Sequence, residues 1–349
     1  LLDRKIHPTV ITKGYRIAAE KAREILEELA IKISPQDENT LRQIASTSMT
    51  GKGAEDMKEH FANLIVKAVK QIQENGRIDL ENIKIEKIKG EGIKETELVS
   101  GIVFDKEKVS IDMPQKIENA KIALLDVALE IKGLEKETRI SITSPEQFQS
   151  FIDQEERMLK TMVSKVLQSG ANVIFCQKGI DDVAQYLLAK EKIYACRRVS
   201  KSDLEKLAKA TGGKIVSNLN ELSEKELGKA SVVEEMKHGE DTLTYVRGCE
   251  NPKSVTLLIH GGSEHVIDEI ERAIKDGLGD VSAALKNGKI VAGGGAIEIE
   301  LARRLREFAQ ALSGREQLAV EEFASALEYI PTTLAENAGL DPIDILTEM

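Results

Sequence analysis

The hydrophobic residues of this chain change their spacing from one stretch to the next. Residues 14–30, 37–46 and 55–73 repeat apolar positions every three or four residues, which predicts amphipathic helices. From Arg77 onward the apolar positions become short, alternating and punctuated by glycine, which predicts strands. Residues 171–218 then alternate strand-like and helix-like runs, as expected for parallel strands joined by helical crossovers.

The last third of the chain returns to helical spacing after two late strands, predicted at 242–247 and 254–259. A helix from residue 265 to 285 has one apolar face, formed by Val266, Ile270, Ala273, Ile274, Val281 and Leu285. Its other face carries Glu269, Arg272, Asp276 and Asp280. Further helices are predicted at 298–311 and 315–329, with Pro331 ending the second. We therefore expect a mixed α and α/β multidomain fold, in which an α/β unit is inserted into an outer helical body.

Three consecutive glycines, Gly293, Gly294 and Gly295, stand between a short apolar run and a predicted helix. Glycine tolerates positive φ and lets a ligand approach the backbone, while the first N–H groups of a helix lack partners and carry partial positive charge. An anion such as phosphate would bind well there. A glycine run also serves as a tight turn or a close helix contact, so the pattern alone leaves both interpretations open.

A second informative stretch is a long helix predicted from a cap at Ser144, with Pro145 in the first turn, to about residue 167. Its first half places Phe148, Phe151 and Ile152 among polar and acidic residues. The second half carries a regular apolar stripe of Leu159, Val163 and Val166. The early apolar residues belong either to a core or to an exposed contact surface for other proteins.

Composition narrows the class of protein. The 349 residues are enough for two or three domains, and 41% hydrophobic with 31% charged residues is typical of a globular protein with a substantial core. No stretch of about 18 apolar residues predicts a membrane span, and the first residues show no signal peptide. Three cysteines without metal-ligand spacing indicate reduced, buried thiols and a cytoplasmic location. A net charge of −10 and 3% aromatic residues argue against a nucleic-acid binder.

Three long motifs identify a family resemblance. The motifs are EHVIDEIERAIKDGL, AGGGA followed by Glu298, and ENAGLDPIDIL. They closely resemble motifs of the group II chaperonins, the thermosome and its cytosolic eukaryotic relatives, and they occur here in the same order. The resemblance implies an ATP-dependent chaperone subunit that uses ATP and Mg²⁺. It also implies unfolded polypeptide clients and a double ring of identical or homologous subunits, without nucleic-acid or membrane partners.

The resemblance also implies a domain plan. An equatorial domain would be formed by residues 1–33 and 290–349, and an intermediate domain by residues 34–104 and 254–289. The inserted apical domain would span 105–253, with a helical protrusion at about 135–168.

Particular residues acquire roles by the same resemblance. Asp276 corresponds to the family's catalytic acid, and Gly293, Gly294 and Gly295 to its nucleotide-binding loop. Lys52 lies in a TGK loop that approaches the terminal phosphate in the family, although by pattern alone it is a surface lysine on a connector. Phe148, Phe151 and Ile152 correspond to the protrusion, where apolar side chains meet clients or neighbouring subunits.

The sequence also departs from the family pattern. Family members carry a GDGTT phosphate loop and a metal-binding acid upstream of the position of Leu1. They carry residues that contact the ribose and the adenine downstream of the position of Met349. We therefore expect the chain as given not to hydrolyse ATP at a useful rate. Gly277 stands where alanine is common, weakening the helix by about 0.5–1 kcal/mol, and Asp280 where an apolar residue is common. Three alternatives remain: a polypeptide-binding fragment without ATPase activity, a small-molecule α/β enzyme, and a purely structural ring subunit.

Overall fold

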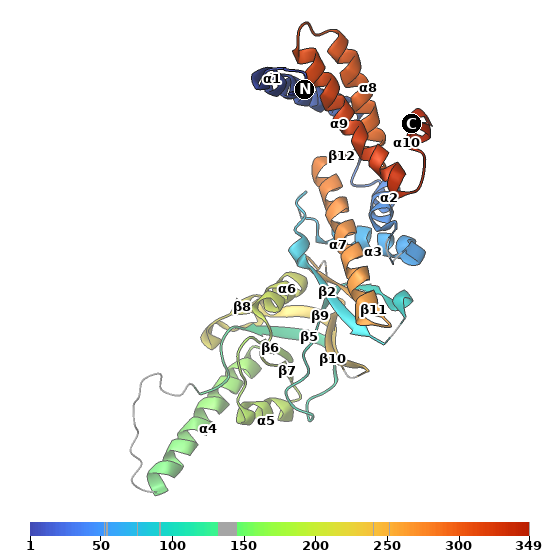
Figure 1. Ribbon diagram of the computed structural model, residues 1–349. Helices are drawn as coiled ribbons and strands as arrows, with labels where there is room; N and C mark the ends of the chain where they lie inside the picture. Colours follow the sequence, from blue (N-terminus) through green and yellow to red (C-terminus); the bar gives the residue numbers. More distant parts are fainter. Residues whose placement is uncertain are drawn as a thin grey trace. The chain divides into compact units, whose positions relative to one another are not determined.

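The computed structural model describes residues 1–51, 53, 55–74, 76–90, 92–131, 145–239, 241–250 and 252–348 (Figure 1). The side chains of residue 55 and residues 145–148 lie outside the description. The chain forms two compact units: unit 1 comprises Leu1–Asp37 and Asn287–Met349, and unit 2 comprises Glu38–Lys286.

Unit 1 is built from helices. They are α1 (Pro8–Leu29), α8 (Ala296–Gln310), α9 (Glu316–Asn337) and the short α10 (Pro342–Glu348). A two-stranded antiparallel ribbon joins β1 (Ile31–Lys32) to β12 (Lys289–Ile290). The apolar stripes of α1, α8 and α9 meet in one core that includes Ala18, Ile25, Leu305 and Val320.

Helix α1 begins before the apolar stretch that starts at residue 14, and it begins with the cap and the first-turn proline that residues 7–10, HPTV, predict. His7 caps it, because the Thr9 backbone N–H donates to His7 Nδ1 at 3.3 Å. Pro8 then occupies the first helical position, where the missing N–H costs nothing. Pro8 and Thr9 are exposed, and Val10 and Ile11 are only partly buried, so the first turn adds little to the buried apolar face of the helix.

The prediction that Pro331 ends the helix expected at residues 315–329 is wrong, since α9 continues through this proline to Asn337. Proline removes one backbone donor from a helix interior and normally breaks the helix. Here the ring is buried and lies against Gly295, where an added Cβ would be only 2.5 Å from Pro331 Cβ. Burial of the ring against this glycine offsets part of the cost of the lost hydrogen bond.

Unit 2 contains a seven-stranded mixed sheet. In spatial order its strands are β4 (Gly101–Phe104), β10 (Asp241–Arg247), β9 (Gly228–His238), β5 (Lys116–Leu125), β6 (Val173–Cys176) and β7 (Tyr194–Cys196), with β8 (Ile215–Val216) also paired to β5. Strands β5 to β8 pair in parallel, as the alternating pattern predicts. Strands β4, β10, β9 and β5, which lie outside the stretch 171–218 predicted to be parallel, pair antiparallel, so the sheet as a whole is mixed.

Helices cover both faces of this sheet (Figure 1). Helices α4 (Pro145–Gln168) and α5 (Asp182–Lys190) pack on the face that receives Ala123 and Leu125 of β5, while α6 (Lys201–Thr211) packs on the face that receives Ile122 and Leu124. All three cysteines are free and buried, which confirms the expectation of buried thiols. Burial raises the pKa of the Cys176 thiol to about 11.

A second sheet of unit 2 has three strands, with β11 (Val255–Gly261) between β2 (Ile83–Lys89), which is parallel to it, and β3 (Glu97–Val99), which is antiparallel. The two late strands predicted from sequence therefore exist but belong to different sheets. Helices α2 (Glu38–Met49), α3 (Lys58–Ile72) and α7 (Glu264–Asn287) complete this part of the fold. Short 3-10 helices lie at Glu55–Met57, Leu80–Asn82, Ile93–Glu95, Leu219–Glu221 and Glu224–Glu226.

Within the described part of the chain, none of the helices combines the length and the apolar character that crossing a membrane requires.

Candidate functional site

The glycine loop of unit 1 leads directly into helix α8. Gly294 and Gly295 have φ values of 69° and 89°, in the left-handed region that favours glycine. Gly293 and Gly294 are exposed, and a Cβ added at either would meet no atom within 4 Å. Gly295 is buried against Pro331. Two of the three glycines thus present open backbone to a ligand, and the third also serves helix packing.

The start of α8 gives this loop its electrostatic character. Gly295 occupies the N-cap position and offers no side chain to the first N–H groups of the helix. The Ile299 backbone N–H donates to the Gly295 carbonyl at 3.1 Å, which starts the helical ladder. The N-terminus of a helix carries partial positive charge, so open glycine backbone beside it fits a phosphate group. The described residues contain no cluster of three or more His, Cys, Asp or Glu side chains that could hold a metal, so no ligands for Mg²⁺ are assigned.

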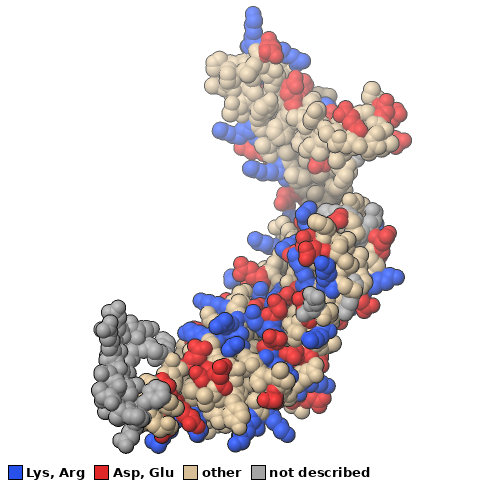
Figure 2. Space-filling model, turned by 60° about the horizontal axis from the view of Figure 1, so that its bottom comes forward, with Lys and Arg blue, Asp and Glu red and all other residues tan. Residues whose placement is uncertain are grey.

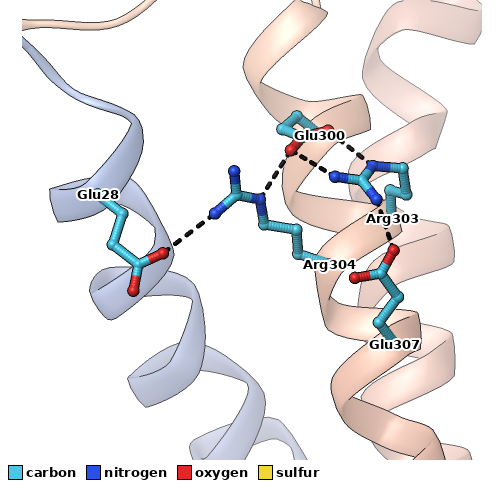
Figure 3. Close-up of polar contacts among 5 residues, drawn as sticks. All are labelled: Glu28, Glu300, Arg303, Arg304 and Glu307. Carbon is cyan, nitrogen blue, oxygen red and sulfur yellow. Dashed lines mark hydrogen bonds and ion pairs between the residues drawn. The ribbon is translucent and has the colours of Figure 1, made fainter.

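An ion-pair network lies along the middle of α8 (Figure 3). The Glu300 carboxylate accepts from Arg303 Nε at 2.8 Å and from Arg304 Nε at 2.7 Å, and Arg304 also pairs with Glu28 of α1 at 3.1 Å. Arg303 further binds Glu307. Hydrogen bonds from Arg303 and Arg304 lower the pKa of Glu300 to about 2. Sequence reasoning missed this network, although the acid and the arginines stand at i, i+3 and i+4 spacing.

Helix α7 in unit 2 carries the predicted row of acids. Glu269, Asp276 and Asp280 are exposed, while Ile270, Ala273, Ile274 and Val281 of the predicted apolar face are buried. Two other acids of this helix bind Lys87 of β2: Asp268 at 2.8 Å and Glu271 at 2.5 Å. The hydrogen bonds that Lys87 donates to Asp268 and Glu271 raise the pKa of its ammonium group to about 12. These pairs attach the first turns of α7 to the three-stranded sheet.

Gly277, which follows Asp276, lies at a close helix contact. A Cβ added there would lie 2.7 Å from Ile65 Cδ1 of α3 and 3.2 Å from Ser48 Oγ of α2. Such distances are shorter than ordinary carbon contacts of about 3.5–4.0 Å. The glycine therefore lets α7 approach α2 and α3 at the turn that bears Asp276.

The loop between α2 and α3 also contacts α7. The Gly53 backbone N–H donates to Glu269 Oε1 at 2.7 Å. Lys52, predicted to approach a terminal phosphate, lies outside the described residues. The structure thus brings the neighbour of Lys52 onto the helix that bears Asp276.

The predicted contact residues at the start of α4 are solvent-facing where they are described. Phe151 and Ile152 are 38% and 39% exposed, and Met158 is 45% exposed. Leu159, Val163 and Val166, by contrast, are buried in the core of the large sheet. The side chain of Phe148 and residues 132–144, which include part of the predicted protrusion, lie outside the described residues. The change from an exposed to a buried helix face takes place near residue 159.

Acidic and basic side chains are interspersed over the face shown in Figure 2. The described residues on this face form no broad positive surface of the kind that follows a nucleic-acid backbone.

The chain belongs to the TCP-1/cpn60 chaperonin family, whose model matches residues 1–349. It is 59% identical over 353 residues to a thermosome subunit of Methanopyrus kandleri and 58% identical over 353 residues to thermosome subunit beta of Archaeoglobus fulgidus. Both matches cover 100% of this chain and 65% of the relative, so the chain spans about two thirds of the length of these relatives.

Among solved structures, the chain is similar to the open-state monomer of a group II chaperonin from Methanococcoides burtonii, with a TM-score of 0.70 and 48% identity. That similarity covers 99% of this chain and 81% of the other. The predicted resemblance to the group II chaperonins and the predicted mixed multidomain fold are confirmed.

Proposed function

We propose that this chain forms part of an ATP-dependent chaperonin subunit that binds unfolded polypeptides and encloses them in a double ring of identical or homologous subunits. The observation that carries the proposal is the open, left-handed glycine backbone at the N-terminus of α8 in a chain that matches the chaperonin family throughout. The separation of Leu1–Asp37 and Asn287–Met349 from the rest supports an equatorial part made of both chain ends. The remaining domain limits are proposed as the sequence predicts them.

The glycines before α8, Asp276 and Lys52 have different roles in the proposed hydrolysis of ATP. Gly293 and Gly294 offer backbone to a phosphate, and the N-terminus of α8 stabilises its charge. Asp276, exposed on α7, orients the attacking water or takes its proton, and Lys52 supplies positive charge at the terminal phosphate. Mg²⁺-ATP, when bound, supplies the phosphoryl group and neutralises the charge that develops on it.

The exposed start of α4 serves client binding in this proposal. Phe151, Ile152 and Met158 present apolar surface that the core of the large sheet does not use. Exposed apolar groups of this kind mark surfaces that bind other proteins. The same observation favours a second candidate function, a polypeptide-binding chaperonin part without its own ATPase activity.

Asp276→Ala in the full-length protein tests the proposal. The side chain is exposed, and alanine has the better helix propensity, so the fold should remain intact. Loss of a general base typically lowers the rate by about 10²–10⁴-fold. We expect ATP binding to change little, steady-state phosphate release to fall within that range, and the control Asp280→Ala to keep most activity. Normal turnover by Asp276→Ala, or equal losses in both variants, would contradict the assigned role, whereas client capture without any ATPase activity in the wild type would favour the second candidate.

A further inference from the structure

A pocket with a volume of about 440 Å³ lies where three segments of unit 2 meet. Its walls come from residues 105–109, which follow β4, residues 197–198, which follow β7, and residues 241–242, which begin β10. The volume falls within the range of about 300–1,000 Å³ that is usual for small-molecule sites. We call it the Arg197 pocket. It belongs to the large sheet and shares no residue with the glycine loop before α8.

The wall segment after β4 is held in place by hydrogen bonds. The Thr244 hydroxyl donates to the Lys106 carbonyl, and the Lys108 backbone N–H donates to Glu235 Oε2 at 2.8 Å. The Lys108 ammonium group donates to the Met113 carbonyl at 3.0 Å. A wall fixed in this way is already ordered before a ligand arrives, which lowers the entropic cost of binding.

Four basic residues line the Arg197 pocket: Lys106, Lys108, Arg197 and Arg198. The two lysines are half-buried and the two arginines are exposed. Among the described residues, the side chains of Lys106, Arg197 and Arg198 take part in no ion pair and no side-chain hydrogen bond. Their charges are therefore available to a ligand. A guanidinium group offers parallel N–H donors that match two oxygens of a phosphate.

The backbone of Arg198 adds a second observation. Its φ is 54°, in the left-handed region, and its N–H donates to the Lys178 carbonyl at 3.1 Å. This conformation is unfavourable for a residue with a Cβ, so local geometry alone would favour glycine or asparagine here. Residues held in such conformations cluster at ligand-binding sites. The chain thus places an arginine in the pocket wall against its own backbone preference.

Three acids also line the pocket and limit the kind of anion that fits. Asp105, Glu107 and Asp241 are all exposed, whereas the two lysines between and beside the first two are half-buried. The wall therefore carries one net positive charge, in a chain whose net charge is −10. Exposed acids repel a long polyanion such as nucleic acid. A small anion that reaches the lysines avoids most of this repulsion.

We propose that the Arg197 pocket binds a small phosphate-bearing molecule through Arg197, Arg198 and Lys106. This site is separate from the glycine loop before α8, and the inference does not depend on the proposed ATPase function.

Titration calorimetry of the full-length protein with inorganic pyrophosphate at low ionic strength tests this inference. A hydrogen bond to a charged group contributes enough that its loss weakens binding by about ten- to a hundredfold, and we expect that loss for Arg197→Ala and for Lys106→Ala. Arg197→Lys keeps the charge but not the planar fork and should lose less. Arg157→Ala removes an exposed arginine of α4 outside the pocket and should bind as the wild type does. Thermal unfolding of each variant checks that the fold is intact.

Pyrophosphate bound at another site of the protein would survive Arg197→Ala, so only the binding that this variant weakens supports the inference. Equal pyrophosphate affinity in the wild type, Arg197→Ala and Lys106→Ala would overturn it, as would the absence of saturable binding by the wild type. Binding of a phosphate-free acidic peptide in place of pyrophosphate would assign the pocket to a protein contact and would also overturn it. Any of these results leaves the proposed ATPase function standing, because Arg197→Ala should not change steady-state phosphate release.

Discussion

Two glycines of α7, Gly277 and Gly279, allow a matched test of how closely this helix packs. Replacing glycine by alanine in a helix interior stabilises it by about 0.5–1 kcal/mol through backbone entropy. At Gly279 an added Cβ meets no atom within 4 Å, so Gly279→Ala should show that gain alone. At Gly277 the Cβ would lie 2.7 Å from Ile65 Cδ1, roughly 1 Å inside an ordinary carbon contact.

The cost at Gly277 follows from the burial of its neighbour. Ile65 is 0% exposed, so its side chain cannot move without displacing other core atoms. Overpacking of this kind costs about 1–3 kcal/mol. The gain in helix propensity is common to both variants, so Gly277→Ala should be less stable than Gly279→Ala by about 1–3 kcal/mol. In domains of about 150–250 residues each kcal/mol corresponds to about 2–4 °C in melting temperature.

Calorimetric and denaturant-induced unfolding of the wild type and the two variants would measure this difference. We expect Gly279→Ala to unfold at a slightly higher temperature than the wild type and Gly277→Ala at a lower temperature than Gly279→Ala. If the two variants gained stability equally, the close approach of α7 to α3 would not be a real constraint, and the packing argument would be refuted.

Two further predictions concern α4 and α8. Because Phe151 is 38% exposed, Phe151→Ala should lower the free energy of unfolding by well under the about 3–5 kcal/mol that a buried phenylalanine contributes. Capture of an unfolded client by the full-length protein should weaken. A large loss in melting temperature would instead place Phe151 in a core. The pKa of Glu300 is lowered to about 2 from 4.5, so its pairs stabilise the fold above about pH 4.5, and this contribution is lost as the pH falls toward 2. Since Glu300 is partly exposed, Glu300→Gln should cost about 1 kcal/mol or less at pH 7, and less still at pH 3; a pH-independent difference in unfolding free energy would contradict the assignment.

The predictions from sequence were most accurate for helices whose apolar residues all face one core. The helix from residue 298 to 311 matches α8 within a few residues because Leu301, Ala302 and Leu305 are buried at helical spacing. The prediction from sequence failed at Pro331, because the packing of the proline ring against Gly295 depends on a distant part of the chain. The antiparallel half of the large sheet was also missed, since alternation reveals a strand but not its partner.

At the candidate site, too, features set by local spacing could be predicted from the sequence, and contacts between residues far apart in the chain could not. The exposure of Asp276 and Asp280 could be predicted from helical periodicity, because opposite faces of one helix are set by local spacing. The attachment of Gly53 to Glu269 could not be predicted, because the two residues lie 216 positions apart and neither has an unusual local pattern. The roles that the family resemblance gives to Lys52, Asp276 and the glycines remain predictions.

The packing of Gly277 changes the interpretation of its departure from the family pattern. In isolation, a glycine in place of the common alanine weakens α7 by about 0.5–1 kcal/mol. In the structure, the missing Cβ lets Ser48 and Ile65 approach the turn that carries Asp276. The loss in helix propensity is therefore offset by a close contact that, together with the Glu269 hydrogen bond, fixes α7 against α2 and the loop after it. An alanine at this position would strengthen the helix and at the same time bring its Cβ against Ile65 and Ser48, so its effect on hydrolysis by the full-length protein should follow packing more than helix propensity.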